Sequence, residues 1–84
     1  MDGGELDRTT VTLKAAIAEA RLRLAAADWA VEPDVRDIIR YAREMHGLLL
    51  DALRTSDPLA AAQHRWIADS TGQAVDELET LITR

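Results

Sequence analysis

The segment from residue 11 to residue 31 carries two rows of apolar side chains, each repeating in alternating steps of four and three residues. At about 100° per residue of an α-helix, the two rows lie about half a turn apart. The first row consists of Leu13, Ile17, Ala20, Leu24, Ala27 and Val31, and the second of Val11, Ala15, Ala18, Leu22, Ala25 and Trp29. A helix that is apolar on opposite sides is normally covered on both. One row can face the rest of the chain, and the other then needs a second partner.

Proline and aspartate mark the boundaries of three predicted helices. Pro33 disfavours helical backbone at Glu32 and is itself a good first residue of a helix. Asp57 is a good N-cap residue before Pro58. Apolar rows with four-three steps continue between these boundaries. The predicted helices span residues 7–30, 33–55 and 58–83.

Residues 1–6 lack an apolar period and include Gly3 and Gly4, so we expect a flexible leader before a single helical domain over residues 7–84. Asp7 or Thr9 would then cap the first helix.

Gly72 interrupts the last predicted helix, and Ser70 with Gln73 has the spacing of a capping box that would restart a fourth helix. The apolar row keeps its phase across Gly72, which favours one continuous helix. Because the links between helices are short, neighbouring helices should be antiparallel. We therefore predict an all-α, antiparallel up-down-up three-helix bundle. The alternative is an extended helical layout that closes only as a dimer.

Composition narrows the function classes. The chain has 84 residues and 15 alanines, which suffices for one domain with a thin core and favours stabilisation by a partner. The net charge of −5 disfavours direct nucleic-acid binding. Without cysteine there are no disulfides or thiolate metal sites. The abundance of Arg and Ala is typical of a bacterial or phage protein.

Neither a signal peptide nor a membrane span is expected. The first residues are acidic and lack an apolar segment. No apolar run approaches the ~18 residues that a transmembrane helix requires. We therefore expect a cytoplasmic protein.

His46 and His64 fall on the apolar rows of the second and third helices. We expect them to lie about two turns apart, too far for one metal ion with metal–nitrogen distances of ~2.0–2.1 Å. A histidine that hydrogen-bonds to Gln63, Ser70 or Tyr41 is the favoured interpretation. The sequence contains no nucleophile motif or phosphate-binding loop, so we expect neither an enzyme nor a cofactor.

A stripe of charged residues covers the polar side of the second helix. Its arginines alternate with acidic residues, which is typical of a solvated face and predicts the ion pairs Arg40–Glu44 and Asp51–Arg54. An alternative is that the arginines clamp an acidic protein segment. The stripe consists of Arg36, Asp37, Arg40, Arg43, Glu44, Asp51 and Arg54.

The second apolar row of the first helix is the strongest candidate for a functional surface. Trp29 is of the residue type most enriched at binding hot spots. We predict a small non-catalytic interaction or regulatory protein that forms a homodimer through Val11, Ala15, Ala18, Leu22, Ala25 and Trp29. Two alternatives remain. The protein's own second and third helices cover both rows, or the chain is an acidic, antitoxin-like inhibitor of a basic partner.

Overall fold

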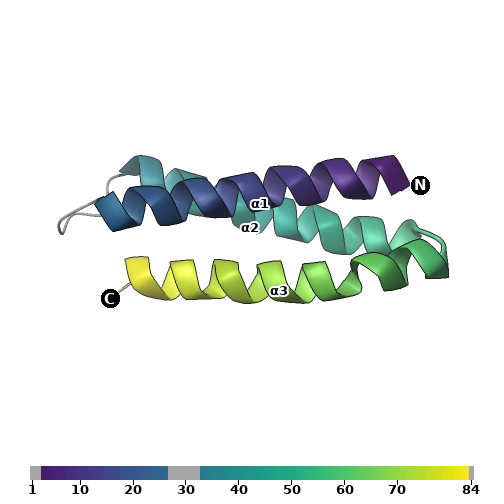
Figure 1. Cartoon of the computed structure of the whole chain (residues 1–84). Helices are drawn as coiled ribbons and strands as arrows, with labels where there is room; N and C mark the ends of the chain where they lie inside the picture. The colour runs from purple at the N-terminus through teal and green to yellow at the C-terminus, as the bar shows by residue number, and fades with distance from the viewer. Residues whose placement is uncertain (1–2, 27–32, 84) are drawn as a thin grey trace.

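Three long helices make up the computed structural model, which describes residues 3–26 and 33–83. They are α1 (Gly3–Ala26), α2 (Pro33–Thr55) and α3 (Pro58–Ile82). Each helix packs against the other two, and α2 runs antiparallel to both α1 and α3 (Figure 1). The predicted up-down-up three-helix bundle is thereby confirmed. The bundle is elongated, with extents of 44 × 19 × 15 Å.

The predicted starts of α2 and α3 are confirmed. Pro33 is the first residue of α2, and Asp34 lies in its first turn. At α3, the Asp57 carboxylate accepts hydrogen bonds from the backbone N–H groups of Leu59 and Ala60, both at 3.0 Å. These bonds satisfy donors that have no partner inside the helix.

The start of α1 differs from the expectation. The helix begins at Gly3, not near Asp7 or Thr9, so residues 3–6 of the expected leader are helical. The physical reason is Leu6, which is fully buried. Leu6 lies seven residues before Leu13 and therefore extends the inner apolar row of α1 by two turns. The predicted end of this helix, and the beginning of the link to α2, fall in residues 27–32, outside the described residues.

The core runs the length of the bundle between the three helices. Small alanines, among them Ala16, Ala20 and Ala42, are buried between larger aliphatic side chains. Alanine at such positions lets helix axes approach closely, although each alanine buries little apolar area. The largest fully buried side chains are Leu6, Leu13, Ile39, Leu49, Val35 and Val75.

The third helix is continuous through Gly72, as the phase of its apolar row predicted. Within the described residues, no helix is long and apolar enough to cross a membrane.

Candidate functional site

The two apolar rows of α1 meet opposite environments. Leu13, Ile17 and Ala20 of the first row are buried against α2 and α3. In the second row, Val11 is 66% exposed and Leu22 is 67% exposed. Thus α2 and α3 cover one side of α1 only. We call the described members of the second row the outer face of α1; they are Val11, Ala15, Ala18, Leu22 and Ala25, and all are exposed. Trp29, the sixth predicted interface residue, lies outside the described residues.

Charged side chains flank the outer face, with two cations on one side and a Glu–Arg ion pair on the other. Lys14 and Arg21 lie on the side toward α3, where both line a cavity between α1 and α3. Glu19 lies on the other side, where its carboxylate accepts a 2.9 Å hydrogen bond from Nε of Arg23. The Arg23 guanidinium is also 3.9 Å from Asp34 of α2. The outer face therefore has a basic edge along α3 and an acidic residue along α2.

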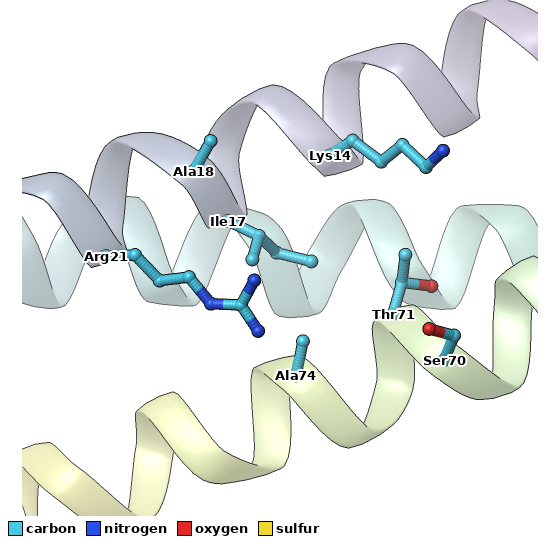
Figure 2. A pocket seen from close by; sticks show the side chains of 7 residues that line it. All are labelled: Lys14, Ile17, Ala18, Arg21, Ser70, Thr71 and Ala74. Atoms are coloured by element: carbon cyan, nitrogen blue, oxygen red, sulfur yellow. The ribbon is translucent and has the colours of Figure 1, made fainter.

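The cavity between α1 and α3 has a volume of about 260 Å³. Figure 2 shows Ile17 reaching from α1 into the space between the helices and Arg21 extending toward Ala74 of α3. Thr71 also lines this cavity, but its hydroxyl donates a 2.7 Å hydrogen bond to the Ile67 carbonyl of its own helix. The cavity is thus a shallow groove beside the outer face, lined by both apolar and polar side chains, with cations at its α1 edge.

His46 is buried at the contact between α2 and α3. Its Nε2–H donates a 2.9 Å hydrogen bond to the backbone carbonyl of Ala68. The prediction of a hydrogen-bonded histidine is confirmed, but the partner is a main-chain carbonyl instead of Gln63, Ser70 or Tyr41. A Cβ atom on Gly72 would lie only 2.8 Å from His46 Nε2. Glycine at this position therefore makes room for the imidazole.

His64 joins the start of α3 to the start of α1. Its Nε2 is 2.9 Å from Oδ1 of Asp7, and its Nδ1 is 3.0 Å from the Ala60 carbonyl. Since both ring nitrogens face acceptors, the charged imidazolium fits the site best. The hydrogen bond to Ala60, and then the one to Asp7, raise the pKa of His64 above its ordinary value. Within the described residues, no cluster of His, Asp and Glu side chains has the arrangement of a metal site.

Arg43 was expected on a solvated face, but it bridges α2 and α3. Its guanidinium forms ion pairs with Asp76 and Glu79 of α3. The hydrogen bonds to Glu79 and Asp76 raise the pKa of Arg43 above its ordinary value. The acidic segment that this arginine binds therefore belongs to its own chain.

The predicted ion pairs within α2 have mixed outcomes. Asp51 and Arg54 lie 3.6 Å apart, as predicted. Arg40 pairs with Asp37 at 3.9 Å instead of Glu44. Both pairs are strongly exposed, so neither contributes much to stability.

Comparisons with known proteins do not assign this chain to a family. A scan of protein-family models and searches of curated proteins and of solved structures find no match. Any functional conclusion therefore depends on the surface of this chain.

Proposed function

We propose that this chain is a small non-catalytic interaction protein that acts through the outer face of α1 and associates with a second copy of itself. The observation that carries the proposal is the exposure of Val11 and Leu22, about two thirds each, on a helix whose opposite side is fully packed. Covering one such aliphatic side chain contributes about 1.5–3 kcal/mol. The intervening alanines allow a second helix to approach closely.

Other exposed apolar side chains do not form a comparable surface. Leu59 and Trp66 lie seven residues apart on α3, but the charged Asp69 follows three residues later on the same face of the helix. Tyr41 and Leu48 lie seven residues apart on α2, with Glu44 beside them. On α1 the apolar row continues from residue 11 to residue 25 without a charged member. A continuous row of this kind is typical of a helix that packs along its length against another helix.

The proposal is tested by sedimentation equilibrium of the wild type and two variants. Leu22→Arg places a charge within the outer face and should convert a wild-type dimer to a monomer. The matched control is Leu59→Arg, because Leu59 is 70% exposed and lies on α3. We expect this variant to dimerise like the wild type.

A wild type that stays monomeric at high micromolar concentration would refute self-association. It would leave the acidic-inhibitor alternative, which draws on the net charge of −5. Equal dimerisation of the wild type and Leu22→Arg would refute the assignment to the outer face. Circular dichroism of each variant should show unchanged helix content, since both positions are exposed.

A further inference from the structure

We infer that the partner on the outer face is α1 of a second copy, packed parallel and in register as a short coiled coil; this inference rests on the proposed function. The steps of four and three define heptad positions along α1. Ala15 and Leu22 occupy position a, whereas Val11, Ala18 and Ala25 occupy position d. The positions that flank such a seam, e and g, set the orientation of paired helices through their charges.

The flanking charges on α1 fit a parallel pair. Lys14 and Arg21 occupy position g, and Glu19 occupies position e. In a parallel dimer, a g residue meets the e residue that is five positions further along in the other helix. Lys14 therefore meets the partner's Glu19, and symmetry produces this attractive pair twice.

An antiparallel pair brings together different residues. In that orientation g residues face g residues, and e residues face e residues. Lys14 would then lie against the partner's Arg21, again twice by symmetry. These like charges oppose the antiparallel orientation. The parallel orientation keeps Lys14 away from Arg21 and places the two copies of Arg8, at position a, near each other at the exposed start of the row.

The side chains concerned are positioned to make these contacts. Lys14 is exposed and forms no ion pair within the described part of the chain. The side chain of Glu19 is 48% exposed even though it pairs with Arg23. A carboxylate has about four acceptor sites, so Glu19 can accept from Arg23 and from a lysine together. All five residues of the outer face are exposed, although Ala18 also lines the groove between α1 and α3.

Single cysteines provide a direct test of orientation, because the natural chain contains none. Val11→Cys and Ala25→Cys each place one thiol near one end of the outer face. In a parallel dimer, each variant alone should form a disulfide-linked dimer under mild oxidation. In an antiparallel dimer centred on Ala18, neither variant would cross-link alone, but their mixture would form a disulfide between the two variants. Positions 11 and 25 are about 21 Å apart along a helix, which no disulfide spans.

A matched cysteine controls for random collision. Ala62 lies on the exposed side of α3, so Ala62→Cys should keep a free thiol under the same oxidation. If the mixture of Val11→Cys and Ala25→Cys forms a disulfide while neither variant does so by itself, the parallel inference is overturned. If Val11→Cys and Ala25→Cys cross-link neither alone nor when mixed, while Leu22→Arg abolishes dimerisation, the parallel inference is also overturned and the proposed function stands. If no cysteine variant cross-links and the wild type also sediments as a monomer, the proposed function itself is refuted.

A charge exchange tests the role of the flanking residues. Lys14→Glu converts each attraction to the partner's Glu19 into a repulsion and should weaken dimerisation by about tenfold at low salt. The double variant Lys14→Glu/Glu19→Lys restores opposite charges and should recover most of the affinity. The effect should shrink in 0.5 M salt, because salt screens exposed charges. Tighter dimerisation of Lys14→Glu would indicate the antiparallel orientation and overturn the inference.

Discussion

The two sides of α1 have similar side chains and opposite surroundings. Leu13 on the inner side is fully buried, whereas Leu22 on the outer side is 67% exposed. Both leucines belong to rows with the same four-three repeat. The comparison teaches that periodicity identifies each face that can pack, whereas the path of the remaining chain decides which face is packed internally. The outer face is left exposed.

The largest expected effect comes from truncating Leu13, and Leu22 is the matched exposed leucine. Leu13→Ala should lower the free energy of unfolding by about 3 kcal/mol, since it removes apolar contacts and leaves a cavity in the core. Leu22→Ala should change the unfolding of the monomer by less than about 0.5 kcal/mol, because the side chain is exposed. Urea unfolding followed by circular dichroism measures both values.

Protein concentration separates the stability of the fold from that of the dimer. A dimer adds stability that rises with concentration, whereas the monomer's own stability does not. The proposed dimer predicts a concentration-dependent stability for the wild type, and Leu22→Ala should lose that dependence. Equal losses for the two leucine variants at low concentration would contradict the assignment of inner and outer sides.

Gly47 of α2 and Gly72 of α3 both lie inside long helices but have different surroundings. Gly72 faces the buried His46 ring, and a Cβ atom there would lie 2.8 Å from Nε2. Gly72→Ala should destabilise the fold by about 1–3 kcal/mol, because the imidazole must move and its bond to Ala68 is strained. A Cβ atom on Gly47 would instead point into open space. Gly47→Ala should stabilise the fold by up to about 1 kcal/mol through higher helix propensity.

A double variant identifies the cause of the Gly72 effect. In a His46→Ala background the imidazole is absent, so Gly72→Ala should no longer destabilise the protein. Thermal unfolding of the four combinations gives the coupling between positions 46 and 72. Additive losses would show that the contact between glycine and histidine is not what constrains position 72.

The smallest expected effect is the pH dependence due to His64 at the edge of the bundle. Its pKa is raised in the folded protein by Ala60 and Asp7, so the charged form stabilises the fold. This contribution is fully present below the unfolded pKa of about 6.5 and is lost as pH rises through the higher folded pKa. Urea unfolding at pH 5.5 and 8.5 should show it as a change below about 1 kcal/mol.

Asp7→Asn is the matched variant for this measurement. It should lower the NMR titration midpoint of His64, which retains its hydrogen bond to Ala60. The variant should also lose part of the pH-dependent stability that the wild type shows between pH 5.5 and 8.5. Asp7 lies near the start of α1, so a pH-independent loss is expected too and must be subtracted. An unchanged midpoint would contradict the role of Asp7.

Most of the fold was predictable from local signals. Pro33 and the Asp57-Pro58 pair begin helices because their chemistry fits a helix N-terminus in any context. The continuity of α3 followed from the unbroken phase of its apolar row. The start of α1 was missed although Leu6 carried a signal, since it lies on the same row as Leu13. Gly3 and Gly4, which disfavour a helix, precede this leucine and oppose its signal.

The contacts between helices were less predictable. Arg43 resembles its neighbours on the polar stripe of α2, yet it binds two carboxylates of α3. His46 binds a backbone carbonyl, and every residue supplies one of those. No residue type therefore marks Ala68 as a partner in the sequence. Such contacts depend on how far one helix is shifted and rotated against another.

The sequence by itself determined three helices, most of their boundaries and the presence of two apolar rows on α1. These properties depend on backbone conformation and on a period of 3.6 residues, both of which are local. Only the tertiary structure decided which row became the core, which charges bridge helices and why Gly72 must be small. Those outcomes depend on distances between residues remote in the chain, and such distances are set by the packing of whole helices.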